Sequence, residues 1–161
     1  MAQTAAPTGA QAILPILSMH TYFSGATKIY PGDFVSILAG GRLVPSTAGA
    51  VEMVGVAMGY SAAAGNAVLV SDATNQQYYI QDDGVSATLA ATDVGLNADI
   101  IATVGNTTFL ASRMAIDTDS KQTTTLNFRI LGKHPDDTWA KYVRVRGVIN
   151  EHAFGKKTTG I

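Results

Sequence analysis

Cysteine is absent from this chain of 161 residues, so disulfide bonds and thiolate metal sites are excluded. Charge is also scarce: Asp, Glu, Lys and Arg make up 14% of the residues, against roughly 25% in ordinary soluble domains. The chain is nevertheless 47% hydrophobic, whereas a disordered chain combines low hydrophobicity with high charge. This composition favours one folded domain, or one domain with an arm, and is typical of a β-rich structural protein.

A targeting signal and a membrane span are not expected either. The first twelve residues contain no Lys or Arg, so the positively charged start of a signal peptide is missing. The apolar run 12–17 is six residues long and contains Pro15, whereas a membrane-spanning helix needs about 20 apolar residues. We therefore expect no membrane partner, and synthesis and folding in a cytoplasm.

Helical periodicity is the third absence. No window keeps apolar residues at i, i+3, i+4 and i+7 over ten or more residues. Short apolar and β-branched runs alternate instead with turns rich in Gly, Pro, Asn and Asp, and Gly55 and Gly59 inside one run indicate bulges or a close backbone approach, as at a barrel corner. The sequence therefore predicts an all-β fold, a small β-barrel or sandwich-like domain. The predicted strands are 34–38, 42–44, 51–60, 67–70, 77–81, 98–103, 108–116, 123–131 and 141–149.

The N-terminal residues 1–19 carry no charge and are rich in Ala, Thr, Gln, Gly and Pro. They predict an extended N-terminal arm that is ordered only where a neighbour holds it, followed by a β-rich domain over residues 20–161. An extended arm of this kind can add a strand to the open edge of a neighbouring sheet. The apolar residues of the arm that we expect to make contacts are Ile13, Leu14, Ile16 and Leu17.

Charge is unevenly divided along the chain. Residues 1–112 contain two basic and seven acidic residues, a net charge of −5, whereas residues 113–161 contain nine basic and five acidic residues, a net charge of +4. Such an asymmetry can orient a protein on a partner surface or align subunits head to tail. An ordinary solvated surface is the other interpretation, and the sequence leaves both open.

Three arginines lie on the last two predicted strands. Side chains alternate with a period of two along a strand, so Arg129 on strand 123–131 and Arg144 and Arg146 on strand 141–149 lie opposite the apolar face of each strand. If the two strands pair as a hairpin, the arginines share one exposed face, which is either simply solvated or a contact site for an acidic protein surface. Nucleic acid is not the expected partner, since the chain has only 11 Lys and Arg and a pI of about 6.2.

Phosphate-binding and nucleophile motifs are incomplete in this sequence. The Gly-Lys pairs at 132–133 and 155–156 lack the other residues of a Walker loop. Residues 59–63, Gly-Tyr-Ser-Ala-Ala, lack the final glycine and the parallel sheet of a nucleophile elbow. We expect no catalytic residues and no cofactor. A small β-fold hydrolase remains the enzymatic alternative, and it requires a pocket where two titratable groups converge.

Metal-binding patterns are weak as well. His20, His134 and His152 do not have the spacing of a metal site, and the fragment 117–119, Asp-Thr-Asp, lacks the glycine and the distal glutamate of a calcium loop. Neighbours such as Glu151 and His152 point to opposite faces of a strand and do not chelate one ion together. We expect no metal, with a histidine cluster at a symmetry axis as the open alternative.

Four short segments carry a family resemblance. They are 29–35 (IYPGDFV), 94–100 (VGLNADI), 126–132 (LNFRILG) and 148–152 (VINEH). They resemble, in order, the opening strand, the middle segment and the last two strands of the capsid decoration (cement) proteins of tailed bacteriophages. The chain departs from that family after Asn106, where a Ser/Gly-rich stretch is expected and is missing.

The resemblance implies a head decoration protein, commonly a trimer on the outside of the expanded capsid that clamps neighbouring capsid subunits. Its implied partners are the major capsid protein and further copies of itself as a homotrimer, at the outer surface of the virion after synthesis in the cytoplasm of a bacterial host. Residues 20–161 are then the capsid-binding domain. The alternative is a virion surface module for a host glycan or receptor, which exposed aromatics beside Asp or Asn would favour and a buried Trp139 would weigh against. On this interpretation the capsid and subunit interface contains Ile13, Leu14, Ile16, Leu17, Arg129, Arg144 and Arg146.

Overall fold

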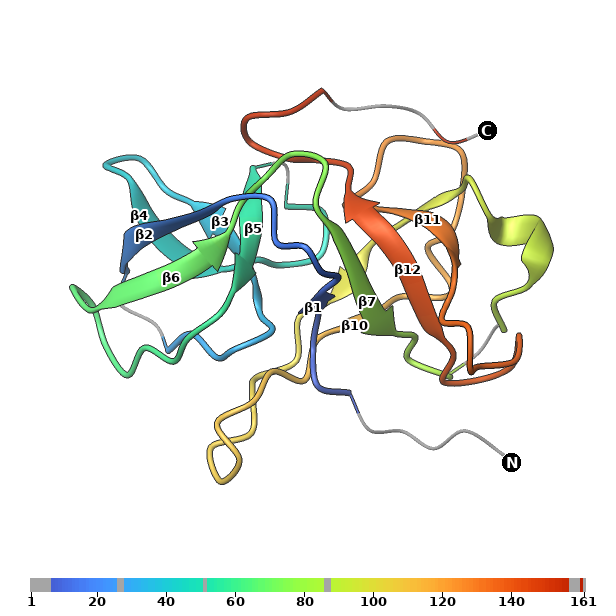
Figure 1. Ribbon diagram of the computed structural model, residues 1–161, viewed down its shortest axis with the longest axis horizontal. Coiled ribbons are helices and arrows are strands. Elements are labelled where there is room, and N and C mark those ends of the chain that lie inside the picture. Colours follow the sequence, from blue (N-terminus) through green and yellow to red (C-terminus); the bar gives the residue numbers. More distant parts are fainter. Residues whose placement is uncertain (1–6, 26–27, 51, 86–87, 157–159, 161) are drawn as a thin grey trace.

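A computed structural model describes residues 7–25, 28–50, 52–85, 88–156 and 160. These residues form twelve β-strands and one short 3-10 turn, η1 (Ala91–Asp93), with no α-helix among them. The fold is therefore all-β, as the alternation in the sequence predicts. Five strands close into a barrel, and a second five-stranded sheet lies beside it (Figure 1).

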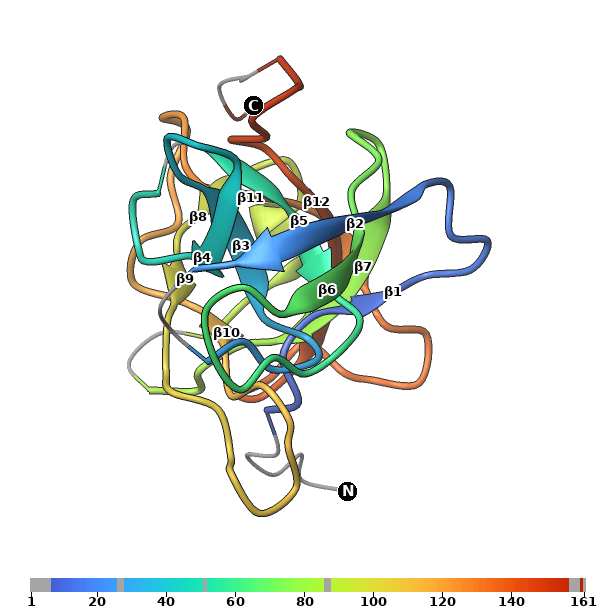
Figure 2. The ribbon, with the colours of Figure 1, turned by 90° about the vertical axis from the view of Figure 1, so that its left-hand side faces the viewer.

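The barrel is built from the first half of the chain. Its neighbours are antiparallel, except that β2 runs parallel to β4, and closure leaves no open edge for pairing with another chain. Aliphatic side chains, most of them β-branched, form the cluster inside the barrel. Figure 2 shows the path of the barrel strands from the barrel side of the molecule. The strands, in their order around the barrel, are β2 (Met19–Ser24), β4 (Arg42–Pro45), β3 (Phe34–Ile37), β5 (Met53–Ala57) and β6 (Ala67–Ser71).

The second sheet joins the N-terminal segment to the C-terminal third of the chain. All of its pairings are antiparallel, and a separate pair of short strands, β9 (Ile100–Ile101) and β10 (Ala115–Ile116), lies next to it. One face of the sheet is apolar and the other is polar, because side chains alternate along each strand. The order is β1 (Gln11–Ala12), β7 (Gln77–Gln81), β12 (Arg144–Ile149), β11 (Phe128–Lys133) and β8 (Asn97–Ala98).

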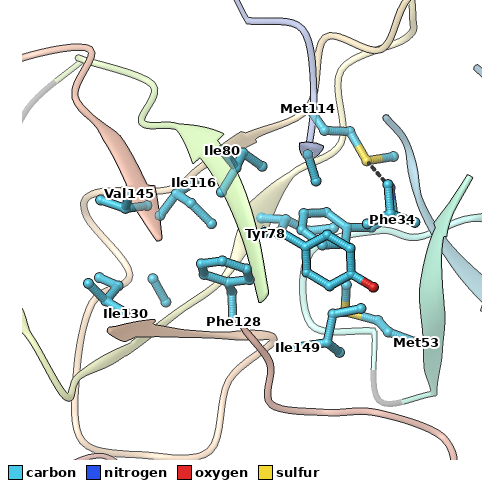
Figure 3. Close-up of a cluster of buried hydrophobic side chains, with 14 of the residues drawn as sticks. Phe34, Met53, Tyr78, Ile80, Met114, Ile116, Phe128, Ile130, Val145 and Ile149 are labelled. Atoms are coloured by element: carbon cyan, nitrogen blue, oxygen red, sulfur yellow. Dashed lines mark hydrogen bonds between the residues drawn. The ribbon is translucent and has the colours of Figure 1, made fainter. Parts of the chain in front are cut away.

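The barrel and the second sheet share one apolar core. Strand β5 is buried along its whole length, with Val54 and Ala57 inside the barrel and Met53 and Val56 facing the second sheet. Phe34 of β3 also faces the sheet, and Figure 3 shows it beside aromatic and branched side chains of β7, β11 and β12. Because both bodies bury side chains in the same cluster, we expect them to fold together.

Two parts of the structure differ from the predicted strands. Strand β2 was not predicted, because most of its residues are exposed and its sequence has no clear apolar alternation. The predicted strands 98–103 and 108–116 are mostly wrong: only five of their residues belong to strands, namely Ala98 in β8 and the four residues of β9 and β10. Residues 102–114, which we call the finger, form a loop whose tip protrudes from the body (gold in Figure 1), while Ser112 and Met114 at its base are buried. The side chain of Asn106 binds the backbone of the turn at the tip.

The N-terminal segment is held by the same chain. Strand β1 pairs with the edge of β7, the N–H of Ala10 donates to the carbonyl of Gly32 over 2.9 Å, and Ala10 is buried in the shared core. The neighbours that hold these residues are therefore β7 and the turn at Gly32. Residues 1–6 of the predicted arm lie outside the described residues.

Candidate functional site

The apolar residues predicted for the arm form a loop at the end of the second sheet. We call residues 13–17 the leucine loop. The side chain of Gln76, which is 1% exposed, ties both ends of this loop: its amide nitrogen donates to the carbonyl of Ile13 over 2.7 Å, and its amide oxygen accepts the N–H of Leu17 over 2.9 Å. The Leu14–Pro15 peptide bond within the loop is cis. Because Gln76 ties both of its ends, the loop is a preformed element of the surface.

Exposure differs among the four apolar residues of the leucine loop. Leu14 is 79% exposed and Leu17 is 51% exposed, whereas Ile13 and Ile16 are half-buried. Exposed leucines on a loop with a fixed conformation lose little conformational entropy when a partner covers them. Leu14 and Leu17 are therefore the residues of the loop that are available for an apolar contact.

The predicted arginine hairpin is present in the second sheet. Strands β11 and β12 pair with Arg129 opposite Val148 and Arg146 opposite Gly132, with a register shift between Ile130 and Gly132. The residues that alternate with the arginines along the strands, among them Phe128, Ile130 and Val145, belong to the buried core. Arg129, Arg144 and Arg146 consequently lie on the outward face, which we call the arginine face.

The arginines of this face differ in how their charge is compensated. Arg144 forms a two-pronged ion pair with Asp137, with Nη2 2.6 Å from Oδ1 and Nε 3.1 Å from Oδ2. This hydrogen-bonded guanidinium holds the pKa of the Asp137 carboxyl below its ordinary value. Arg146 is exposed and has no ion pair with any residue that the structure describes. Within the described chain, Arg146 is therefore better placed than Arg144 to meet an acidic partner.

The leucine loop and the arginine face lie on one sheet. Gln77 of β7 accepts the N–H of Ile13 through its carbonyl, and it also pairs with Val148, which in turn pairs with Arg129. Two elements that are more than a hundred residues apart in the sequence are thus linked across β7. The sequence contained both elements, but it did not show that β7 brings them together.

One group of polar side chains converges around Asp72, at the end of β6. The Asp72 Oδ2 atom lies 2.7 Å from His20 Nδ1 and accepts the hydroxyl of Tyr22 over 2.7 Å, and the hydroxyl of Ser18 lies 3.3 Å from the same His20 nitrogen. Burial by itself raises the pKa of Asp72, but the hydrogen bonds from Tyr22, His20 and Ser18 together hold it below its ordinary value.

This group does not have the geometry of a hydrolase triad. In a triad, one imidazole nitrogen faces the nucleophile and the other faces the carboxylate. Ser18 and Asp72 both contact Nδ1 of His20, so no proton path runs from the serine through the ring to the carboxylate. His152 contacts the backbone carbonyl of Asp72 instead, over 3.1 Å. The arrangement is that of a hydrogen-bonded junction between β2, β6 and the C-terminal segment.

His152 is a structural residue in this junction. Its Nε2 faces the carbonyl of Asp72, and its Nδ1 accepts the N–H of Phe154 over 3.1 Å, so the ring is neutral with the proton on Nε2. Burial lowers its pKa. Among the described residues, no group of three or more His, Asp or Glu side chains is arranged to hold a metal ion.

Asp82 is a buried carboxyl whose pKa is strongly raised. It lies at the end of the β7 region, is 1% exposed, and its Oδ1 accepts the N–H of Tyr142 over 2.6 Å. Burial, with a smaller contribution from the neighbouring charge of Asp83, raises its pKa to about 6. Between about pH 4 and pH 6, the Asp82 carboxyl is therefore protonated to a larger extent in the folded chain than in the unfolded chain.

The Asp82→Asn variant is expected to be more stable than the wild type at pH 7.5 and not at pH 4. The contribution of Asp82 to stability is fully present at low pH and is lost as the pH rises through about 6. The asparagine keeps the acceptor for Tyr142 but is never charged, so the gain is about 1–3 kcal/mol. Urea denaturation at the two pH values measures it. The exposed Asp119→Asn variant is the control, and an equal effect of Asp82→Asn at both pH values contradicts the expectation.

Trp139 is half-buried and packs against the shared core, so it is neither the buried tryptophan that would weigh against glycan or receptor recognition nor a fully exposed platform. Sequence reasoning missed two features of the surface: the Gln76 side chain that ties the leucine loop, and the exposed Phe109 on the finger, which is 79% exposed. The apolar pair Phe109-Leu110 within a polar turn sequence was the available signal for the second feature.

Comparison with known proteins gives no further identification. No protein-family model matches the chain, and no curated protein and no solved structure gives a significant match. Among the described residues, there is also no helix long and apolar enough to cross a membrane. The fold defines the chain as an all-β protein with a closed barrel and a second sheet.

Proposed function

We propose that this chain is a non-catalytic virion structural protein that binds the outer surface of a tailed-phage capsid and stabilises the assembled shell as a trimeric decoration, or cement, protein. Its partners are the major capsid protein and further copies of itself. Neither a cofactor nor nucleic acid takes part. Because only the assembled lattice offers the complete site, binding stabilises the assembled state over free capsid subunits.

One observation carries this proposal: the four segments that resemble decoration proteins all contribute side chains to the same core. Each segment provides at least one residue of this buried cluster, namely Phe34, Ile100, Phe128 and Ile149. Figure 3 labels three of them, Phe34, Phe128 and Ile149. Strands β8, β11 and β12, each of which overlaps one of the segments, are neighbours in the second sheet. A resemblance concentrated in core positions is what a shared fold produces, since core residues determine packing.

Two features of the surface support a binding role. Leu14 and Leu17 are exposed on a loop that Gln76 holds in one conformation, and Arg146 provides an exposed positive charge on the same sheet. An apolar contact with a nearby charge suits a protein surface, where burial provides affinity and charge provides orientation. Many copies bound to a repeating lattice also gain from avidity.

Quantitative mass spectrometry of purified virions tests the proposed function. We expect a ratio close to one copy of this chain for each major capsid subunit, as lattice-wide decoration requires. A few copies in each particle would transfer the chain to a tail, vertex or fibre and make receptor binding the leading function. Absence from the virion would exclude a structural role.

The double variant Leu14→Ser, Leu17→Ser is expected to bind capsids at least tenfold more weakly than the wild type. Complete burial of one leucine side chain contributes about 1.5–3 kcal/mol, and about 1.4 kcal/mol corresponds to a factor of ten in affinity. The measurement is co-sedimentation with expanded capsids prepared from a phage that lacks the gene for this chain.

Leu38→Ser is the matched control for this experiment, because Leu38 has the same 51% exposure as Leu17 but lies on the barrel. Equal loss of binding in the control and the double variant would remove the leucine loop from the interface. These point variants are preferable to deletion of residues 1–19, since deletion also removes β1 and the buried Ala10 and would disturb the second sheet.

A further inference from the structure

Three segments of the chain meet at Asp82, just after β7. The N–H of Asp82 donates to the carbonyl of Val143 over 3.0 Å, and the N–H of Asp83 donates to the carbonyl of Ile116 over 3.0 Å. The Oδ1 atom of Asp82 accepts the N–H of Tyr142 over 2.6 Å. These contacts join segments that lie far apart in the sequence, and together the segments form what we call the clasp, residues 81–85, 116–118 and 141–143.

Asp82 is buried in the clasp without a compensating cation. No ion pair joins it to any residue that the structure describes. Its second oxygen, Oδ2, is buried and has no hydrogen-bond partner in the described part of the chain, whereas buried charges are normally paired. A protonated carboxyl therefore fits this site better than a carboxylate, because burial disfavours the charged form.

The charged side chains of the clasp do not offset a charge on the buried carboxyl. Asp83 is the next residue, and its Oδ1 accepts the N–H and the hydroxyl of Thr118 over 3.4 Å and 2.8 Å. Asp117 adds a second acidic side chain on the same segment as Thr118. Lys141, on the third segment, donates through Nζ to the carbonyl of Val85 over 3.0 Å. Burial, with a smaller contribution from the charge of Asp83, accordingly raises the pKa of the buried carboxyl to about 6.

Tyr142 has a backbone conformation that depends on this junction. Its φ is 64°, in the left-handed region that residues other than glycine rarely adopt. Its ring, the remaining titratable side chain of the clasp, lies against Gly84, where an added side chain would collide with it. Its carbonyl accepts the side-chain amide of Gln81 over 3.0 Å. Because β12 begins two residues later, at Arg144, the clasp fixes the start of the strand that carries Arg144 and Arg146 of the arginine face.

We propose that the clasp is a pH-controlled element at the start of β12: it is closed while Asp82 is protonated, and loss of that proton to solvent favours an open form in which the carboxylate is hydrated. The pKa of Asp82 in the closed form is raised above its ordinary value, so the stabilisation of the closed form is fully present below about pH 4 and is lost as the pH rises through about 6. Opening also releases Tyr142 from its left-handed conformation.

The opening is local, and this distinguishes it from the unfolding of the whole chain. Short segments of a folded protein open at a lower free energy than the complete core, and the barrel does not take part in the clasp. The consequence for the arginine face, and so for capsid binding, rests on the proposed function, whereas the opening itself is a property of the chain alone.

Hydrogen exchange of single amides, followed by NMR at pH 4.5 and pH 7.5 and corrected for intrinsic exchange rates, tests the inference. The amides to follow are those of Asp82, Asp83 and Tyr142. We expect each to lose at least tenfold of its protection at the higher pH, since an acid whose pKa falls from about 6 to 3.8 on opening shifts the opening equilibrium by up to about a hundredfold. Low concentrations of urea should leave this exchange unchanged, because local opening exposes little surface.

Two variants and one pair of reference amides are the controls. Asp82→Asn keeps the acceptor for Tyr142 and cannot ionise, so its clasp amides should have the same protection at both pH values. Asp83→Asn removes the neighbouring charge and should keep the pH dependence with a lower midpoint. The amides of Asn106 and Ala111 bond to each other's carbonyls in the finger, which contains no Asp, Glu or His, and should not respond to pH.

Protection of the clasp amides that is independent of pH in the wild type would overturn the inference, as would a pH dependence that persists in Asp82→Asn or disappears in Asp83→Asn. An equal response of the finger amides, or clasp amides that exchange only by urea-dependent unfolding, would show that the opening is not local and would overturn it too. None of these measurements involves a capsid, so failure here is distinguishable from failure of the proposed function.

Discussion

Gly55→Ala is expected to destabilise the protein by about 3 kcal/mol, a large part of the 5–15 kcal/mol that holds a typical domain together. Gly55 lies in β5, where a methyl group would collide with the carbonyl oxygen of Ser71 on β6 and would lie only 2.8 Å from a methyl carbon of Val70. Backbone atoms of a closed barrel cannot move away individually. The barrel must therefore open locally or β5 must shift in register.

Gly59→Ala is the matched control for this prediction. Both glycines belong to the same apolar run of the sequence, but a methyl group at Gly59 meets nothing within 4 Å. We expect this variant to stay within about 0.5 kcal/mol of the wild type. Thermal and urea denaturation of the two variants provide the comparison, and equal stabilities would contradict the close approach of β5 to β6.

Phe34→Ala is expected to cost about 3–5 kcal/mol, in the usual range for removing a buried aromatic side chain. Phe34 is completely buried and is the aromatic contact between the two bodies of the fold. Its ring lies edge-on to Tyr78 of β7, at 6.2 Å between centroids, and to Phe128 of β11, at 5.9 Å (Figure 3). Its loss leaves a cavity where the barrel meets the second sheet.

The way in which the variant unfolds is as informative as the size of the effect. Because barrel and sheet share this core, both Trp139 fluorescence and far-ultraviolet circular dichroism should report the same lowered midpoint. Phe23→Ala on β2, where the ring is 59% exposed, is the control and should change stability by less than about 0.5 kcal/mol. Two separate transitions in the wild type would show that barrel and sheet are independent, which contradicts the shared core.

The local features of the fold were predictable from the sequence. The alternation in β11 and β12 predicted an apolar and a polar face, and the register of the two strands bears this out. The turn at Pro31-Gly32-Asp33 was also predictable: Gly32 has a φ of 90°, and the carboxylate of Asp33 accepts the N–H of Tyr30 over 2.8 Å. These features depend on neighbouring residues and on the period of side-chain alternation, both of which are visible in the sequence.

The candidate surface was predictable only in part. Four apolar residues of 13–17 and three arginines were chosen from the sequence as contact residues. The exposed ones among them are Leu14, Leu17, Arg144 and Arg146, whereas Ile13, Ile16 and Arg129 are half-buried. That Asp137 pairs with Arg144, and that Gln76 ties the leucine loop, required the coordinates. Each of these contacts depends on a side-chain geometry that no sequence pattern encodes.

By itself, the sequence determined the class of the fold, the absence of thiol chemistry, and the face of each long strand on which apolar side chains lie. The tertiary structure alone decided the closure of the barrel, the parallel pairing of β2 with β4, and the attachment of the N-terminal segment to β7. The physical reason is range. Alternation and turn chemistry act between residues that are close in the chain, whereas barrel closure and edge pairing depend on burial between segments that meet only after folding.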